Sequence, residues 1–212
     1  MSTRVLRNKP EIRKRPRQAR SRATVETIVE AAARVLGDEG WAGFTANKVA
    51  DRAGFGIGSL YQYFPNKIAL VEAVRERHLD DCLRAIERCL VNQRGAEDLA
   101  RCLVEGLIQV HTKHPKLHKT LIDEAPISEE LADPLSAFEE KYLGVVAECV
   151  AQQDGEPVSE GHLATARLLS DAMDGAIHNA ARRGQLHEAV LARELTRLVG
   201  SYLLARKRAP ET

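Results

Sequence analysis

A chain of 212 residues with 44% hydrophobic and 29% charged residues fits one domain, or a small domain joined to a larger one, and can bury a core. No apolar run approaches the roughly 18 residues of a membrane span, and no apolar segment follows the N-terminal charges as in a secretory signal, so we expect a cytoplasmic protein. The net charge of +1 is uneven: residues 1–80 carry +6 and the others −5, which predicts a polyanion as partner of the first part.

Residues 1–19 form a basic segment that we expect to be a flexible arm. Two interpretations stay open: a tail with no function of its own, or an arm that contacts a polyanion along its backbone or in a groove. In the second case the contacts come from the basic residues of the segment and those just after it, namely Arg13, Lys14, Arg15, Arg17, Arg20 and Arg22.

The first predicted helix covers "TVETIVEAAARVLGDEG", residues 24–40. Its apolar residues recur at the three- and four-residue spacing of an amphipathic helix, and Gly37 or Gly40 is expected to end it. A second, short helix, "ANKVADRAG", follows with Thr45 as its N-cap and Gly54 at its C-terminal end.

The stretch "AGFGIGSLYQYFPNK", residues 53–67, joins three alternating glycines to a bulky aromatic segment. Gly54 ends one helix and Gly56 can cap the next. Gly58 leaves the first turn of that helix without a side chain, on a face that must approach another group closely. A third helix is predicted over residues 57–64, because the proline that follows disfavours helix at the preceding residue. These elements form a helix-turn-helix. A phosphate-binding enzyme loop is the rival interpretation, but these glycines lie between helices and lack its spacing.

The third helix has two different faces. Leu60 and Phe64 lie four residues apart and are expected to pack inward. Ser59, Gln62 and Tyr63 fall on the other side, which makes the outward face small, polar and aromatic. Such a face suits a DNA major groove, where Ser and Gln hydrogen-bond base edges and phenols reach phosphates.

Residues 20–75 resemble the DNA-binding domain of tetracycline-repressor-type (TetR-family) transcriptional regulators. The stretch "GWAGFTANKVADRAGFGIGSLYQYFPNKIALVEAV" follows the family's order: a glycine, then T-x-x-x-I/V-A-x-x-A-G, a turn, and a recognition helix ending L-Y-x-Y/H-F-x-N/S-K. Two positions depart from it: Gly56 stands where serine is common, and Ile57 where a polar or basic residue is frequent. The first departure weakens a phosphate contact or a cap, and Ile57 can read a thymine methyl group.

The resemblance implies a role for each matched position. Thr45, Tyr63 and Lys67 would contact phosphates; Ile57, Gly58, Ser59 and Gln62 would face bases, with Tyr61 near the backbone. Some alternatives stay open: Tyr61 can belong to the core, Lys48 can be merely solvated, and Thr45 can be only a cap. The residues expected to contact DNA are Arg20, Arg22, Thr45, Lys48, Ile57, Gly58, Ser59, Tyr61, Gln62, Tyr63 and Lys67.

Beyond residue 66 the pattern predicts further helices and no strands, so the expected fold class is all-α. They are expected at about 67–91, 96–113, 116–124, 128–152, 159–183 and 188–207. No catalytic constellation is visible, and we expect no enzyme activity. The cysteines lack zinc-site spacing and are expected to be small buried hydrophobes. His111, His114 and His118 have metal-like spacing, but a proline interrupts them, so we expect no metal and no other cofactor.

In TetR-family proteins the middle helices enclose a ligand pocket and the last two long helices pair into a dimer interface. The resemblance therefore implies an arm at 1–19, a DNA-binding domain at 20–66 and an effector-binding and dimerisation domain at 67–208. Residues 159–207 would form the homodimer, through small and apolar positions such as Ala176 and Leu198, although an intramolecular core is the ordinary explanation of such positions.

An effector pocket is expected within residues 99–178, with apolar lining and a few polar anchors. Asp174 and His178 lie four residues apart, so they can act together as anchors or simply satisfy each other. The residues proposed for this pocket are Leu103, Glu105, Leu107, Ile108, His111, Leu121, Val145, Met173, Asp174 and His178.

The sequence thus predicts a homodimeric transcriptional repressor that binds a palindromic operator and is released by a small hydrophobic effector. The alternative is a small helical enzyme, or a constitutive interaction protein, that contains a helix-turn-helix. Duplex DNA binding that weakens steeply with salt distinguishes the regulator from both, because each neutralised phosphate releases counterions.

Overall fold

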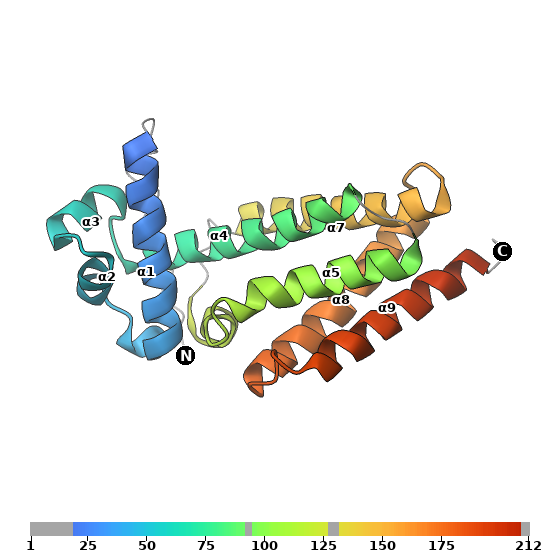
Figure 1. Cartoon of the computed structure of the whole chain (residues 1–212). Helices are drawn as coiled ribbons and strands as arrows, with labels where there is room; N and C mark the ends of the chain where they lie inside the picture. The colour runs from blue at the N-terminus through green and yellow to red at the C-terminus, as the bar shows by residue number, and fades with distance from the viewer. Residues whose placement is uncertain (1–18, 92–94, 127–131, 209–212) are drawn as a thin grey trace, which may run out of the picture. The chain divides into compact units, whose positions relative to one another are not determined.

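The computed structural model describes residues 19–91, 95–126 and 132–208, and the regular elements in that part of the chain are all helical, as expected (Figure 1). These residues divide into two compact units. Unit 1 holds the described residues of 1–77 and 116–135, and unit 2 holds those of 78–115 and 136–212. Within the described ranges, no helix combines the length and the apolar character needed to cross a membrane.

Unit 1 contains the helix-turn-helix and the elements that pack on it. They are α1 (Ala19–Gly43), α2 (Ala46–Ala53), α3 (Ile57–Tyr63), the start of α4 (Lys67–Glu87), α6 (Leu117–Lys119) and the π-helical turn η2 (Thr120–Glu124). The first helix is longer than predicted: it begins at Ala19, because residues 19–23 include good helix formers that extend it backwards. Gly40 has a φ of 67° and marks a kink, which confirms it as a break in the helical pattern.

The core of unit 1 joins the three helices α1, α2 and α3 to α4, α6 and η2. Arg75 on α4 donates a hydrogen bond to the carbonyl oxygen of Leu121 at 3.2 Å, and the backbone N–H of Trp41 donates to Glu124 Oε2 at 3.1 Å. Residues 67–77 and 116–125 therefore belong to the same compact body as residues 20–66. The buried side chains include Ile28, Leu36, Phe44, Val49, Leu60, Phe64, Leu70, Val74, Leu117 and Leu121.

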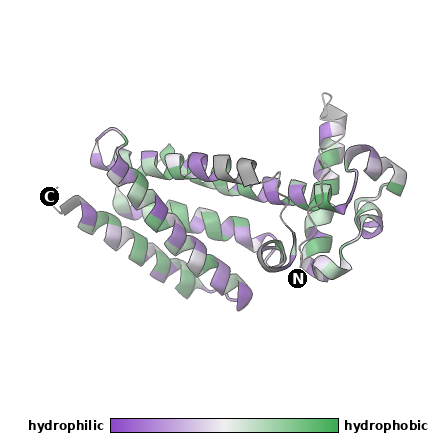
Figure 2. Ribbon diagram, turned by 180° about the vertical axis from the view of Figure 1, so that it is seen from behind, coloured by the Kyte–Doolittle hydropathy of each residue, from purple (hydrophilic) through white to green (hydrophobic). Residues whose placement is uncertain are grey.

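Unit 2 is a bundle of longer helices. It contains the rest of α4, the short 3₁₀ helix η1 (Arg88–Leu90), α5 (Ala96–Thr112), most of α7 (Ala132–Asp154), α8 (Glu160–Arg182) and α9 (Ala189–Arg208). Ser159 fixes the start of α8 with a capping box: its hydroxyl accepts from the backbone N–H of His162, whose ring Nδ1 accepts from the Ser159 N–H. Apolar and polar residues alternate in bands along α8 and α9 (Figure 2).

The cysteines correct one expectation. Cys82 and Cys149 are buried thiols, as predicted. Cys89 and Cys102, however, form a disulfide between η1 and α5, with their Cα atoms 5.8 Å apart. The sequence separation of 13 residues gave no sign of this pairing, because it depends on the turn that brings the start of α5 back to the end of α4.

Candidate nucleic-acid interface

The turn between α2 and α3 has the predicted caps. Thr45 is the N-cap of α2, and its hydroxyl accepts a hydrogen bond from the Lys48 N–H at 3.3 Å. Gly54 ends the helix with a φ of 73°, a left-handed conformation that a side chain would strain. Gly56 is the N-cap of α3 in extended backbone, with no side chain to cap the helix. The turn therefore sets the direction in which α3 leaves α2.

Two buried side chains fix the orientation of α3. Leu60 and Phe64 are fully buried in the core of unit 1, and the Phe64 N–H donates to the carbonyl oxygen of Leu60 to close the last turn. With this face held inward, the opposite face is exposed. Its members, predicted to contact bases or the DNA backbone, are Ile57, Gly58, Ser59, Tyr61 and Gln62.

The glycines leave this surface open. Apart from the adjoining residues and the nearby helix backbone, a methyl group built on Gly56 or Gly58 would meet no atom of the protein within 4 Å. The fold itself therefore does not require a glycine at position 58, which lies inside a helix where glycine is unfavourable. A close approach by another molecule is a physical reason for its presence.

The two lysines beside α3 already have partners. Lys48 Nζ lies 2.5 Å from Glu39 Oε2, so part of its charge is neutralised. The Lys67 ammonium lies 3.8 Å from the centre of the Trp41 ring, a cation–π contact that holds it in place while keeping its charge. Lys67 therefore keeps its full charge, whereas Lys48 shares its charge with an acid.

The remaining predicted contacts vary in accessibility. Tyr61 is 43% exposed, which excludes the core position left open for it, whereas Tyr63 is half-buried against the core of unit 1. Arg22 is exposed on α1. The Arg20 side chain and the arm residues Arg13, Lys14, Arg15 and Arg17 lie outside the described residues.

The residues expected to line an effector pocket do not all lie together. Leu103, Leu107 and Met173 are buried in the core of unit 2, with Ile108 and Val145 packed against it. Glu105 is exposed on α5, and Leu121 is buried in the separate core of unit 1.

The predicted polar anchors of unit 2 meet other polar groups. His178 Nδ1 lies 3.5 Å from Asp174 Oδ2, as the spacing predicted, and His178 Nε2 lies 3.3 Å from His111 Nε2. Burial, together with the neighbouring His178 ring, lowers the pKa of His111 to about 4, so this imidazole is neutral at pH 7.

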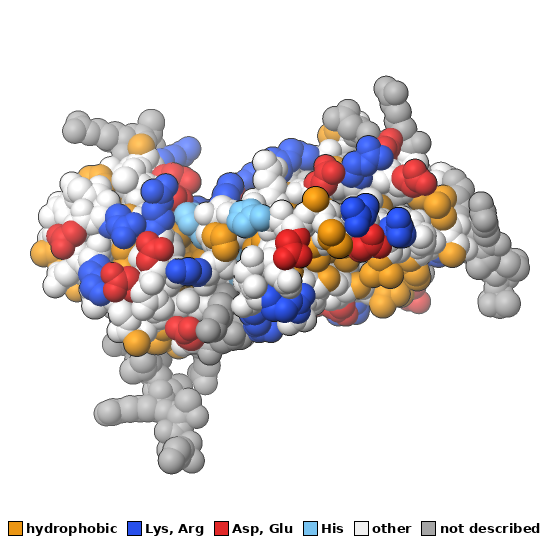
Figure 3. Space-filling view, turned by 60° about the horizontal axis from the view of Figure 1, so that its bottom comes forward, with side chains coloured by type: hydrophobic (Ala, Val, Ile, Leu, Met, Phe, Trp, Pro, Cys, Tyr) orange, Lys and Arg blue, Asp and Glu red, His pale blue; other side chains and the backbone are white. Residues whose placement is uncertain are grey.

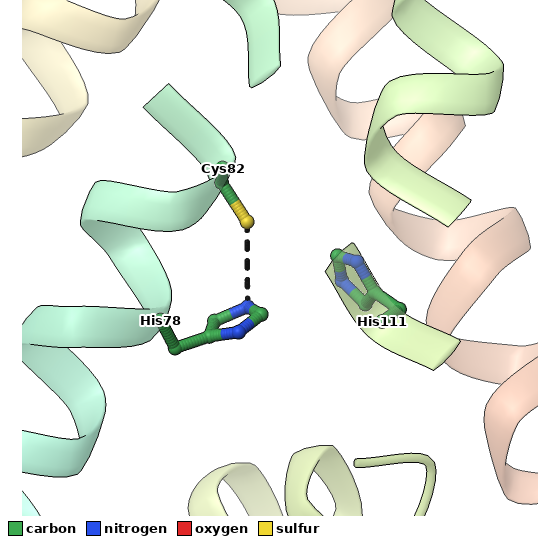
Figure 4. A group of neighbouring side chains, drawn as sticks. All are labelled: His78, Cys82 and His111. Carbon is green, nitrogen blue, oxygen red and sulfur yellow. Dashed lines mark hydrogen bonds between the residues drawn. The ribbon is translucent and has the colours of Figure 1, made fainter. Parts of the chain in front are cut away.

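Two members of this cluster were missed at the level of sequence. His78 and Cys82 lie one turn apart on α4, with His78 Nε2 3.4 Å from Cys82 Sγ, and His111 faces them from α5 (Figure 4). Burial raises the pKa of the Cys82 thiol to about 12, and the Asp174 and Asp81 carboxylates add to this. The i, i+4 spacing of a histidine and a cysteine was the available signal.

Two family models of known proteins match most of the chain. The family model described as "Bacterial regulatory proteins, tetR family" matches residues 28–74. A second, described as "Tetracyclin repressor-like, C-terminal domain", matches residues 97–203.

Individual relatives are more distant. The HTH-type transcriptional activator FasR of Mycolicibacterium smegmatis is 22% identical over 150 residues, which cover 70% of this chain and 68% of the relative. The transcriptional regulator FadR of Bacillus subtilis, solved in complex with stearoyl-CoA, has a TM-score of 0.68 at 18% identity, and the two align over 85% of this chain and 97% of that one. The SmeT–triclosan complex has a TM-score of 0.63 at 24% identity, and the alignment covers 90% of this chain and 96% of that one.

Proposed function

The chain belongs to the tetR family of bacterial regulatory proteins, and from this premise we propose that it binds a palindromic operator as a homodimer and represses transcription until a small hydrophobic effector binds. The observation that carries the proposal is the outward face of α3, where Ser59 and Gln62 are exposed while Leu60 and Phe64 hold the helix from behind. No step of this function requires catalysis.

The contacts follow from that geometry. Gln62 and Ser59 offer hydrogen bonds to base edges, and Ile57, 37% exposed at the start of α3, offers an apolar contact to a thymine methyl group. Thr45 and Lys67 lie at the N-terminal ends of α2 and α4 and would contact phosphates, because helix N-termini present unpaired N–H groups. Arg22 and the basic arm would extend the contact along the backbone.

Selection of bound fragments from the source genome with purified protein tests the proposal directly. The selected sites should share an inverted repeat, and log K for them should fall steeply with log salt. Binding that ignores sequence, or that is insensitive to salt, would reject it in favour of an interaction protein. Transcription from a selected promoter then gives the sign of regulation; the relative FasR is named an activator, so activation is the alternative outcome.

Gln62→Ala and Lys67→Ala should have different effects on DNA binding. Loss of the Gln62 amide should relax sequence preference at one position of each half-site by about 1–3 kcal/mol. Loss of the Lys67 charge should weaken binding to all sequences alike and reduce the salt slope by about one unit per subunit. Titrations of operator and scrambled duplexes at several salt concentrations measure both. If both variants bound like wild type, this face of α3 would not read the groove.

Gly58→Ala should stabilise the protein and weaken operator binding at once. The methyl group meets no atom of the protein and raises helix propensity, so the free energy of unfolding should rise by about 0.5–1 kcal/mol. In the complex with DNA, the same methyl group would fill the space in which DNA and α3 come close together, and so weaken binding. Gly144→Ala on α7, where a methyl group also meets nothing within 4 Å, is the matched control and should leave operator affinity unchanged. Equal operator affinity of Gly58→Ala and wild type would show that DNA does not approach this position.

The proposed dimer uses α8 and α9. Many small and apolar residues of these helices, including Ala166, Met173 and Val199, are buried in the core of unit 2 itself. Other apolar side chains stay exposed and form a patch interspersed with charged residues (Figure 3). A surface of this kind on a soluble subunit supports an interface between subunits. The large apolar residues that are exposed on these two helices are Leu163, Leu168, Val190, Leu198 and Leu204.

A hydrophobic effector is proposed for unit 2. Two structural neighbours were solved with ligands that contain a large hydrophobic part, stearoyl-CoA and triclosan. Leu103, Leu107 and Met173 supply the apolar surroundings, and His111 and His178 supply polar groups beside them. An effector acts only as far as it binds one conformation more tightly than another. Melting temperature and operator affinity, measured with and without stearoyl-CoA as the first probe, test for such coupling.

A further inference from the structure

Four side chains in unit 2 form two pairs of potential metal ligands. On α4, His78 Nε2 lies 3.4 Å from Cys82 Sγ. Between α5 and α8, His111 Nε2 lies 3.3 Å from His178 Nε2. The ligand atoms of His78, Cys82 and His111 all lie within 4.8 Å of one another (Figure 4). His111 is therefore close to the first pair as well as a member of the second. Thiolate and imidazole are the ligands that zinc prefers in proteins.

The protonation of His111 is fixed by its surroundings. Its Nδ1 lies 2.7 Å from the carbonyl oxygen of Leu107, which can only accept a hydrogen bond, so Nδ1 carries the proton and Nε2 presents a lone pair. Metal-binding histidines are typically held in this way, with the second ring nitrogen donating to a carbonyl or carboxylate. Asp174 Oδ2, 3.5 Å from His178 Nδ1, can act on His178 in the same manner.

The distances within each pair suit a tetrahedral ion. With zinc bonds of about 2.05 Å to nitrogen and about 2.3 Å to sulfur, two nitrogen ligands lie about 3.3 Å apart, and a nitrogen and a sulfur about 3.6 Å apart. The His111–His178 separation is 3.3 Å and the His78–Cys82 separation is 3.4 Å. Because His111 lies within 4.8 Å of both members of the first pair, a side-chain shift of at most about 1.5 Å brings it to ligand distance, within the reach of small rotamer adjustments.

Charge and access also favour a cation. The Asp174 carboxylate lies 3.5 Å from His178 Nδ1 and also acts on the Cys82 thiol electrostatically, so its negative charge would partly compensate a dication, whereas Asp81 is already paired with Arg84 and Lys113. His78 is only half-buried, so the cluster is open to solvent on that side, while Cys82 and His111 are buried. The buried side limits hydration of a bound ion, and the open side gives it a route of entry.

We propose that His78, Cys82 and His111 bind a zinc ion in unit 2, with His178 as the fourth ligand. On binding, the Cys82 thiol gives up its proton to solvent and the sulfur and the three imidazole nitrogens complete a tetrahedral site. This proposal is independent of the proposed DNA-binding function, since it is measured without DNA.

Cobalt titration of the full chain tests the site. The protein is freed of metal with a chelator and kept without reductant, so that the Cys89–Cys102 disulfide stays closed. One equivalent of Co²⁺ should give the intense visible bands of tetrahedral cobalt and a near-ultraviolet thiolate charge-transfer band, and one equivalent of Zn²⁺ should remove both. Zinc should also raise the melting temperature, because it binds the folded state preferentially.

Variants assign the ligands. Cys82→Ser should abolish the charge-transfer band, and His78→Gln or His111→Gln should weaken binding by at least about 100-fold, more than loss of an outer-shell partner. Cys149→Ser, which removes the other buried thiol, is the control and should bind cobalt like wild type. No one-equivalent spectrum in the wild type, or a charge-transfer band that survives in Cys82→Ser, would overturn the proposal. Should Cys82→Ser unfold, as judged by circular dichroism, the half-buried His78→Gln and the wild-type titration still decide it.

Discussion

Replacing Leu198 by arginine is expected to give a folded monomer whose affinity for a palindromic operator is lower by about 10²–10⁴-fold. Leu198 lies on α9 with 58% of its surface exposed, so an arginine there costs the single subunit little. In the proposed dimer the same charge would be buried without a partner, which carries a large desolvation cost. Because the two half-sites are read by two linked subunits, loss of the dimer removes the gain from binding both at once.

Light scattering and operator titration measure the two effects of Leu198→Arg separately. Val91→Arg is a matched control: Val91 is 78% exposed at the end of η1 in the same unit, and its variant should remain dimeric. Ala176→Arg is a poorer test, because Ala176 packs against the core of unit 2 and its variant would also lose stability. A wild-type monomer at micromolar concentration would contradict the proposed dimer, and a dimeric Leu198→Arg variant would contradict the proposed face.

The helix-turn-helix could be predicted closely because local chemistry determines it. Thr45 caps α2, Gly54 takes the left-handed conformation that ends it, and Pro65 follows a helix that stops at Tyr63. Each of these signals acts within a few residues, so neighbouring sequence is enough to read them. The burial of Leu60 and Phe64 followed from their four-residue spacing, which also fixed the exposed face of α3.

Features that depend on contacts between distant elements could not be predicted in the same way. A helical pattern shows which residues form an apolar stripe but not what covers that stripe. The sequence therefore does not distinguish Val199, which is buried on the helix that packs against α5, from its exposed neighbour Leu198. The Cys89–Cys102 disulfide depends on the turn that brings the start of α5 back beside η1. The meeting of His78 and Cys82 with His111 needs the packing of α4 beside α5, which no spacing encodes.

Replacing Phe64 by alanine is expected to cost about 3–5 kcal/mol of stability and to abolish operator binding at physiological temperature. Phe64 is fully buried among residues from the helices of unit 1, and it stands directly behind the exposed face of α3. Its removal leaves a cavity, and it also removes the side chain that holds the last turn of α3 on the core. Urea unfolding followed by circular dichroism measures the first effect, and operator titration the second.

Phe64→Leu separates the loss of volume from the loss of the aromatic ring. A leucine keeps the position apolar and refills most of the cavity, so it should recover much of the stability and a measurable affinity for operator. Oligomeric state should stay unchanged in both variants, because the exposed apolar residues of α8 and α9 belong to unit 2 and not to this core. An alanine variant that kept wild-type stability would mean that the core of unit 1 does not depend on Phe64. One that lost stability but bound operator normally at low temperature would mean that α3 is held by α2 and its turn alone.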